Sequence, residues 1–230
     1  MQMPVESRPR FPGFHMSLSG LSTHHLVCSR GYRDLFANLC MDVQPGEILR
    51  VEGKNGSGKT SLLRILAGLA QPVTGDVLWQ GVPIQDVESG YFQNLLYIGH
   101  KPGIKYELSA VENLCLSRAL FGSRSANGIE EALYQIGLYG FEDMPAAMLS
   151  AGQKRRVALA QLYLSPAKLW ILDEPYTSLD VAAVALLEEV FRQHVQAGGM
   201  LIMTSHQPVN IAGCVTKRLA LPDTTIEQVA

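Results

Sequence analysis

The chain has 230 residues and a formal net charge near -2, from 19 basic and 21 acidic side chains. This length is routine for one compact domain, and an apolar content of 47% is enough to bury a sizeable core. The balanced charge argues against a nucleic-acid binder that relies on a broad positive field, and 21 Gly and 12 Pro residues are too few for a disordered chain.

The first residues differ from the rest of the chain. Residues 1–16 are polar and rich in Pro, and they show no hydrophobic period. We expect a disordered extension there, with Met1 or Met16 as the true start. The remaining residues, 17–230, are patterned throughout and are expected to form the folded domain.

The first half of this domain is expected to combine short strands with one helix. Lys59–Ala67 has the apolar spacing of a helix, and it precedes Gly68, a residue type that closes helices. A turn is expected at residues 29–31. The expected strands span residues 23–28, 35–43, 48–52, 76–79 and 95–98.

The second half begins with helices and returns to strands. Three helical stretches, broken by Gly and Pro, predict a helical subdomain over about residues 102–165. The continuous apolar run Leu169–Leu172 is typical of a buried parallel strand. Strands alternating with helices predict an α/β core with a parallel sheet. The expected helices span residues 111–121, 129–136, 151–164 and 181–194, and the last strands span 200–204 and 218–221.

The cysteines and the apolar runs indicate a cytosolic chain. No two of the four cysteines form a CxxC pair, so neither a zinc ribbon nor a redox dithiol is indicated. Their spacings suggest no disulfide framework, and reduced thiols fit the cytosol. No apolar run approaches the roughly 18 residues that a membrane span needs, and the N-terminal residues lack the apolar core of a secretory signal.

The strongest motif lies between the apolar run 48–52 and the helix that follows, and it matches GxxxxGK[ST]. Its glycines let the loop wrap closely, so that backbone N–H groups point at phosphate oxygens, and the helix N-terminus adds positive charge. Lys59 would bridge the β- and γ-phosphates of a nucleotide, and Thr60 would give its hydroxyl to Mg²⁺. A Gly-rich turn is the alternative, which the flanking strand and helix disfavour. The motif comprises Gly53, Lys54, Asn55, Gly56, Ser57, Gly58, Lys59 and Thr60.

Two adjacent carboxylates follow the buried run at 169–172. In a phosphate-loop fold, an acid such as Asp173 at a strand end completes the Mg²⁺ shell, usually through water. Glu174 can orient and deprotonate a water aimed at the γ-phosphate. An acidic pair after a strand can also be a turn or a helix cap, and the preceding phosphate loop favours the catalytic interpretation.

A third motif, Leu149-Ser150-Ala151-Gly152-Gln153, precedes an apolar helix. Ser150 with Gln153 three positions later forms a capping box. A serine and a glycine at a helix N-terminus also make a ready anion site. The two interpretations are compatible.

Taken in order, the phosphate loop, LSAGQ, LWILDEP, Ser178-Leu179-Asp180 and Ser205-His206 resemble the ATP-binding cassette of ABC transporters, over about residues 21–221. The resemblance implies a P-loop NTPase core with a parallel sheet, an antiparallel β subdomain and an inserted helical subdomain. It also implies a homodimer that closes head to tail on two ATP molecules.

The same resemblance assigns roles to individual residues. Each ATP would lie between the phosphate loop of one copy and Ser150, Gly152 and Gln153 of the other. Asp180 would reach across the interface. His206 would hydrogen-bond the γ-phosphate and place the water together with Glu174.

Two positions depart from the usual cassette. The family usually has Gln at the end of the strand after the phosphate-loop helix, where this chain has His100, whose imidazole can accept from a water or bind the metal. The family also has an aromatic side chain that stacks on adenine before the second strand. Tyr32 lies about two positions late for that role, and Arg30 could stack instead.

Further stretches narrow the resemblance. Gly99–Lys105, Leu108–Leu114 and Thr204–Pro208 resemble the ATP-binding subunits of the bacterial cytochrome c maturation (haem exporter) system. This implies the membrane subunits CcmB and CcmC as partners, with CcmD and CcmE in the wider system. It also implies a peripheral location on the cytoplasmic face of the inner membrane, and ATP-driven release of the haem-loaded chaperone CcmE.

Three other interpretations stay open at this point. The chain could serve another small exporter, such as a lipoprotein or drug exporter, although His100 and TSHQP argue against it. A scaffold that binds nucleotide without hydrolysis is disfavoured, because Glu174 and His206 are both present. DNA-repair and ribosome-associated cassettes carry long insertions or two cassettes, for which this chain has no room.

Overall fold

The computed structural model describes residues 19–120, 128–205 and 211–222. The extension expected at residues 1–16 and the candidate His206 lie outside the described residues. The described strands are β1 (Leu21–Arg30), β2 (Arg33–Val43), β3 (Glu47–Glu52), β4 (Thr74–Trp79), β5 (Val82–Pro83), β6 (Leu95–Ile98), β7 (Leu169–Leu172), β8 (Met200–Thr204) and β9 (Val215–Ala220). The described α-helices are α1 (Lys59–Leu66), α2 (Ala110–Leu120), α3 (Ile129–Gln135), α4 (Ala151–Leu164) and α5 (Val181–Gln196).

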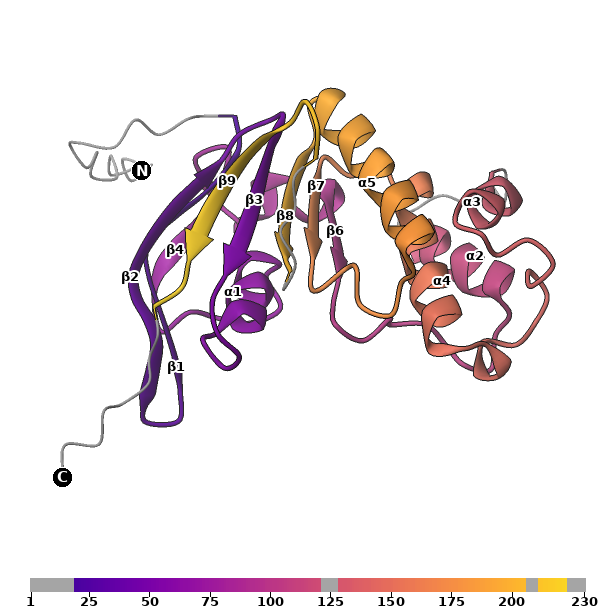
Figure 1. The fold of residues 1–230 in the computed structure, drawn as a ribbon. Helices are drawn as coiled ribbons and strands as arrows, with labels where there is room; N and C mark the ends of the chain where they lie inside the picture. Colours follow the sequence, from indigo (N-terminus) through magenta and orange to yellow (C-terminus); the bar gives the residue numbers. More distant parts are fainter. Residues whose placement is uncertain (1–18, 121–127, 206–210, 223–230) are drawn as a thin grey trace, which may run out of the picture.

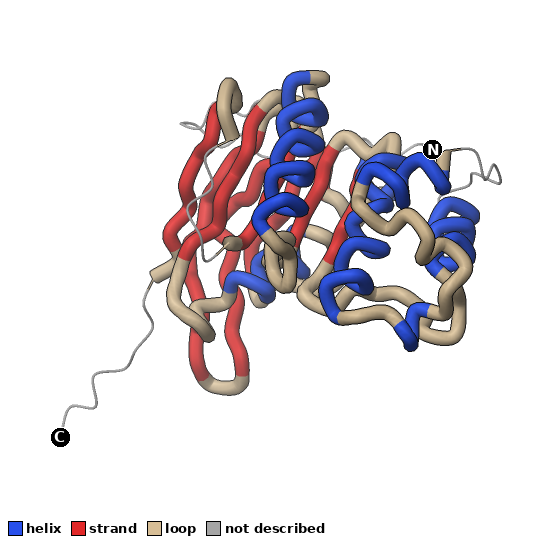
Figure 2. The backbone as a smooth tube through the Cα atoms, turned by 45° about the vertical axis from the view of Figure 1, so that its right-hand side comes forward, coloured by secondary structure: helices blue, strands red, loops and turns tan. Residues whose placement is uncertain are grey.

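The strands form two sheets (Figure 1). Five of them make a parallel sheet in the order β6-β7-β8-β3-β9, and four make an antiparallel sheet in the order β2-β1-β4-β5. Helix α1 lies between the two sheets, and α5 covers the other face of the parallel sheet. Helices α2, α3 and α4 form a separate group beyond α5, which Figure 2 shows from a second side.

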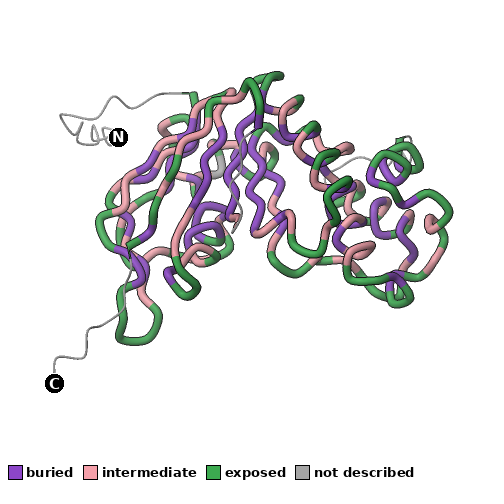
Figure 3. The backbone as a smooth tube through the Cα atoms, viewed as in Figure 1, coloured by how far each residue is buried: buried purple, intermediate pink, exposed green. Residues whose placement is uncertain are grey.

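Alternating side chains of the parallel strands reach two different cores. In β7, Leu169 and Ile171 face α1 and the antiparallel sheet, whereas Trp170 and Leu172 face α5 and the helical group. All four are buried, and so are most residues along the middle of the sheet (Figure 3). The sheet therefore holds the antiparallel layer on one face and the helical group on the other.

The predicted elements are largely confirmed. The strands at 95–98, 169–172 and 200–204 and the helix at 151–164 have the predicted bounds, and α2, α3 and α4 lie within residues 102–165. The turn expected at residues 29–31 was placed too early, because β1 stays paired as far as Arg30. The short strand β5 was not expected, because two residues carry no readable period.

Three neighbouring strands of the parallel sheet end at one edge. Gly53 follows β3, Asp173 follows β7, and Thr204 is the last residue of β8. Since β7, β8 and β3 are adjacent and parallel, their carboxyl ends bring these residues together, at the edge where open α/β sheets bind ligands.

Candidate active site

The loop between β3 and α1 is shaped by glycines. Gly53, Gly56 and Gly58 have φ of 153°, 83° and 98°, values that side-chain-bearing residues rarely adopt. A Cβ on Gly58 would lie 3.0 Å from the Cβ of Leu35, so β2 packs directly on the loop. The Lys59 ammonium donates to the carbonyls of Gly53 and Lys54 at 2.6 and 3.1 Å, which holds it across the loop.

The carboxylate of Asp173 joins the ends of β7 and β8 to the start of α1. Thr60 donates its hydroxyl to Oδ2 at 2.8 Å, and Thr204 donates to Oδ1 at 2.7 Å. Asp173 and Thr204 are buried, with exposed fractions of 2% and 0%. The contact between Thr60 and Asp173 spans 113 residues of sequence and fixes α1 against the end of β7.

Glu174 has an unusual backbone. Its φ of 51° lies in the left-handed region, which is costly for a residue with a side chain. Its N–H donates to the Thr204 hydroxyl oxygen at 2.8 Å, and its carbonyl accepts from the Arg155 guanidinium at 2.9 Å. These two bonds hold the backbone in the strained conformation.

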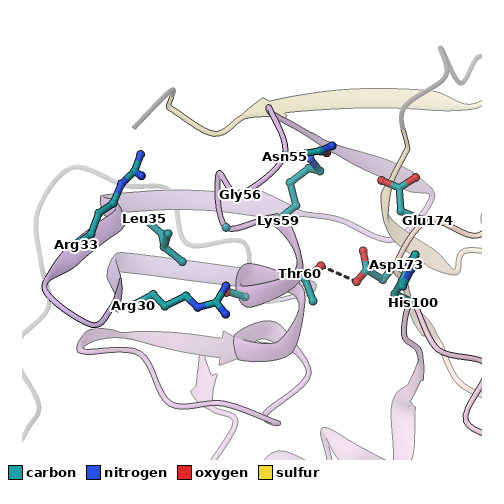
Figure 4. A pocket seen from close by; sticks show the side chains of 12 residues that line it. Arg30, Arg33, Leu35, Asn55, Gly56, Lys59, Thr60, His100, Asp173 and Glu174 are labelled. Atoms are coloured by element: carbon teal, nitrogen blue, oxygen red, sulfur yellow. Dashed lines mark hydrogen bonds between the residues drawn. The ribbon is translucent and has the colours of Figure 1, made fainter. Parts of the chain in front are cut away.

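A cleft of about 630 Å³ runs over this edge of the sheet (Figure 4). The phosphate loop lies in its middle, the two carboxylates and His100 lie at one end, and Arg30, Arg33 and Leu35 lie at the other. Tyr32 is fully exposed and is not part of the cleft wall. The wall comprises Arg30, Arg33, Leu35, Asn55, Gly56, Gly58, Lys59, Thr60, Ser61, His100, Asp173 and Glu174.

The charges in the cleft suit an elongated polyanion. Lys59, Arg30 and Arg33 supply positive charge along most of its length. The N-terminus of α1 opens into the cleft, and no acidic residue stands in its first turn to offset the helix dipole. Phosphate groups would therefore be attracted to the loop.

The oxygen donors at the carboxylate end fit Mg²⁺. The Thr60 hydroxyl and the Asp173 carboxylate lie within hydrogen-bond distance of each other, so one cation can contact both. Mg²⁺ prefers such hard oxygen ligands and usually completes its shell with water and substrate phosphates. Within residues 19–120, 128–205 and 211–222 no cluster of three or more His, Cys, Asp and Glu residues could hold a metal.

The LSAGQ motif lies outside the cleft. The Ser150 hydroxyl accepts from the Gln153 N–H at 3.2 Å and the Gln153 side chain accepts from the Ser150 N–H at 2.9 Å, which confirms the predicted capping box. Asp180 caps α5 through the Ala183 N–H at 2.8 Å. Ser150, Gly152, Gln153 and Asp180 do not line the cleft that the phosphate loop lines.

Comparison with known families agrees with these features. The sequence profile described as "ABC transporter" matches residues 36–177. The cytochrome c biogenesis ATP-binding export protein CcmA of Methylococcus capsulatus is 51% identical over 199 residues, which are 86% of this chain and 96% of that protein. The chain belongs to the CcmA proteins of the ABC transporter family. The Escherichia coli K12 CcmA is 49% identical over 206 residues, 89% of this chain and 97% of that protein.

Solved structures share the fold of this CcmA family member. The ATP-binding subunit of an ABC transporter superimposes with a TM-score of 0.74 at 26% identity, over 82% of this chain and 80% of that one. A dimeric ATP-binding cassette in a post-hydrolysis state with ADP and Pi gives a TM-score of 0.77 at 21% identity, over 90% and 97% of the two chains. Among the described helices of the present chain, none is both long and apolar enough to cross a membrane.

Two residues of the site were not predicted from the sequence. Thr204 and Arg155 contact Asp173 and Glu174 from 18 to 31 residues away, and no role in the site was predicted for either residue. For Thr204, a signal for such a role was its place as a polar residue at the carboxyl end of an otherwise apolar strand. The His194 ring stacks on that of Trp170, with the ring centroids 3.6 Å apart.

Replacing Thr204 with Val tests the link between the strand ends. The Thr204→Val variant keeps the side-chain shape but removes the hydroxyl that bonds to Asp173 Oδ1 and to the Glu174 N–H. Each loss costs about 1–3 kcal/mol when buried, so we expect lower thermal stability. We also expect ATP hydrolysis to fall about tenfold to a hundredfold, because Glu174 is no longer held.

Thr204→Ser is the matched control, since it keeps the hydroxyl and removes only a methyl group. Melting temperature and steady-state turnover of both variants measure the effect. A Thr204→Val protein with the stability and turnover of the wild type would contradict this account of the hydroxyl.

Proposed function

We propose that this chain is the ATP-hydrolysing subunit of an ABC complex for c-type cytochrome biogenesis, and that its ATP turnover releases the haem-loaded chaperone CcmE. The observation that carries the enzymatic part is the single cleft in which the phosphate loop, the Thr60–Asp173–Thr204 contacts and Glu174 meet. The cytochrome part is supported by the similarity to the CcmA proteins over most of the chain.

The triphosphate would lie along the phosphate loop. The backbone N–H groups of residues 53–60 would donate to its oxygens, and the Lys59 ammonium would bridge the β- and γ-phosphates. Thr60 and Asp173 are favoured over His100 as holders of Mg²⁺, because oxygen is its preferred ligand. When bound, this cation neutralises charge on the phosphates.

Hydrolysis would then depend on Glu174. Its carboxylate accepts a proton from a water whose oxygen attacks the γ-phosphorus in line with the leaving group. The bond between the γ-phosphorus and the β–γ bridging oxygen breaks, and ADP and phosphate leave. His100 lines the same end of the cleft and would help to orient this water, as would His206.

The second half of each site would come from another copy of the chain. Ser150, Gly152 and Gln153 stand at the N-terminus of α4, outside the cleft, where a helix dipole favours an anion. In a head-to-tail homodimer they would contact the γ-phosphate held by the partner subunit. Asp180, with an exposed carboxylate, would reach across the same interface.

The nucleobase would lie at the arginine end of the cleft. With the γ-phosphate against Glu174, the base falls beside Leu35, Arg30 and Arg33. A guanidinium plane can stack on a purine. Arg30 lines the cleft and Tyr32 does not, which favours Arg30 for this contact.

Membrane subunits resembling CcmB and CcmC would bind the helical group. The loop between β6 and α2 leads from His100 to that group, and it exposes Lys101, Lys105 and Tyr106. Its far end is anchored, because the Asn113 side chain bonds to the N–H and the carbonyl of Lys105 at 2.7 and 2.9 Å. The chain would therefore sit peripherally on the cytoplasmic face of the inner membrane.

Glu174→Gln tests the catalytic assignment. The variant should bind ATP and form an ATP-dependent dimer, since charge repulsion with the γ-phosphate is removed, but turnover should fall about 10²- to 10⁴-fold with the loss of the base. ATPase assays of the assembly and light scattering measure the two effects. Glu189→Gln, an exposed change on α5, is the control; hydrolysis by Glu174→Gln at the wild-type rate would remove Glu174 from this role.

Arg30→Ala tests the nucleobase contact. A cation–π contact contributes about 0.5–2 kcal/mol, so the Kd for ATP should rise roughly twofold to thirtyfold. Titration calorimetry compares it with Tyr32→Ala, which should bind ATP as the wild type does. If Tyr32→Ala weakens binding while Arg30→Ala does not, the base stacks on the tyrosine.

A deletion strain tests the biological assignment. A bacterium that lacks this protein should contain no haem-stained c-type cytochromes, and the wild-type gene should restore them. A Lys59→Ala copy should not, because the bridging ammonium is lost. Normal cytochromes in the deletion strain would exclude the role in cytochrome c biogenesis while leaving the ATPase assignment intact.

A further inference from the structure

One face of α4 packs on the chain segment 173–180, which carries Glu174. The face consists of Gly152, Arg155 and Arg156, whose spacing places them on one side of a helix. A Cβ on Gly152 would lie 2.7 Å from the Ser178 carbonyl oxygen, so the two backbones are in close contact. Arg156 Nη2 lies 2.5 Å from Asp180 Oδ2.

Arg155 lies at the centre of this contact. It is buried, with 3% of its surface exposed, and its guanidinium donates to carbonyl groups of two strand ends. Nη1 bonds to the Gly99 oxygen at 2.8 Å, and Nη2 bonds to the Asp173 and Glu174 oxygens at 2.8 and 2.9 Å; Nε contacts the Pro175 oxygen at 3.5 Å. One planar fork therefore connects α4 to the ends of both β6 and β7.

These carbonyls belong to residues on which the chemistry depends. Glu174 is held at a positive φ, and such a conformation persists only where neighbouring groups determine it. Arg155 holds the carbonyl of this residue, as Thr204 holds its N–H. The Gly99 carbonyl directly precedes His100, so the same guanidinium also fixes the base of that side chain.

We propose that Arg155 is a positioning residue through which each nucleotide site of the dimer controls the other. Ser150 stands at the N-terminus of α4 and would contact the ATP held by the partner subunit, whereas Arg155, five residues along the same helix, positions the Glu174 that acts on the ATP of its own chain. This inference rests on the proposed head-to-tail dimer.

Ser150 and Arg155 lie close together on α4, so a movement at one is passed directly to the other. A helix moves as a rigid body, so a force on Ser150 from the partner's ATP displaces Arg155 with it. Because the guanidinium is bonded to the carbonyls on both sides of the Glu174 Cα, that displacement changes where the Glu174 carboxylate points. A shift of about 1 Å in a catalytic group can change a rate about 10²-fold.

The experiment uses the full chain in its membrane complex, with Arg155→Lys and Arg155→Met. Lysine keeps the charge but cannot bond to three carbonyls in the same plane, and methionine keeps the length without the charge. The readouts are kcat, the ATP concentration at half-maximal rate, the Hill coefficient and the melting temperature. Arg192→Lys is the control, since this half-buried arginine of α5 pairs with Glu189 and does not line the cleft.

We expect Arg155→Lys to melt below the wild-type temperature, because buried carbonyls lose hydrogen bonds, but to bind ATP within about threefold of the wild-type affinity. Its kcat should fall about tenfold or more. Its Hill coefficient should drop from a value above 1 to about 1. A wild-type kcat and Hill coefficient in Arg155→Lys would overturn the inference, as would a wild-type complex that already hydrolyses ATP without cooperativity.

A double-mutant cycle with Ser150→Ala separates coupling from a purely structural effect. If Arg155 transmits what Ser150 senses, the double variant should lose no more activity than the worse single variant. Multiplied losses would mean that the two residues act independently, and would overturn the proposal. Failure of the proposed function would look different, since the wild-type complex itself would then neither hydrolyse ATP nor pair in its presence.

Discussion

The site depends on one carboxylate, Asp173, which accepts hydrogen bonds from hydroxyls on two other elements. Thr60 belongs to the phosphate-loop helix and Thr204 to the end of β8, so three segments far apart in sequence converge on one buried side chain. A buried carboxylate is tolerated only when its oxygens are bonded or it holds a cation. The same requirement therefore fixes the phosphate loop relative to the strand that carries Glu174, and a cation that binds there arrives between groups that are already in position.

The order of the strands in the parallel sheet brings these three segments together. Because β7, β8 and β3 are parallel neighbours, their carboxyl ends form one row, and residues that follow them meet without long loops. The two cores on either face of the sheet keep this row rigid. The helical group extends from the other side, and Gly152, Arg155 and Arg156 of α4 contact the segment that follows β7. Buried side chains of α4 also pack with those of β6 and β7 in one core, so the helical group and the row of strand ends are in direct contact.

The sequence predicted the features that neighbouring residues define, and it missed the contacts between residues that are far apart in the chain. The phosphate loop, the buried run before Asp173 and the capping box at Ser150 are each defined by neighbouring residues, so a period or a spacing was enough to find them. Arg155 and Thr204 act through several contacts to residues 18–56 positions away, and the sequence does not show which residues they contact. The choice between Arg30 and Tyr32 also needed the fold, because it depends on which side of the hairpin turn faces the cleft.

The charges in the cleft have opposite effects on the binding of ATP. Three cationic side chains and a helix N-terminus attract the triphosphate, whereas Asp173 and Glu174 bring two carboxylates to its most negative end. Repulsion at that end raises the energy of bound ATP, and it is relieved when the γ-phosphate leaves. In the proposed mechanism, Glu174 would therefore weaken the ATP complex whose hydrolysis it promotes. The Glu174 backbone is strained, and α4 packs against it. If the carboxylate points at the γ-phosphate only when α4 is in place, the repulsion would arise only in the closed dimer. There the partner subunit's Ser150 and the dipole of its helix would offset the repulsion.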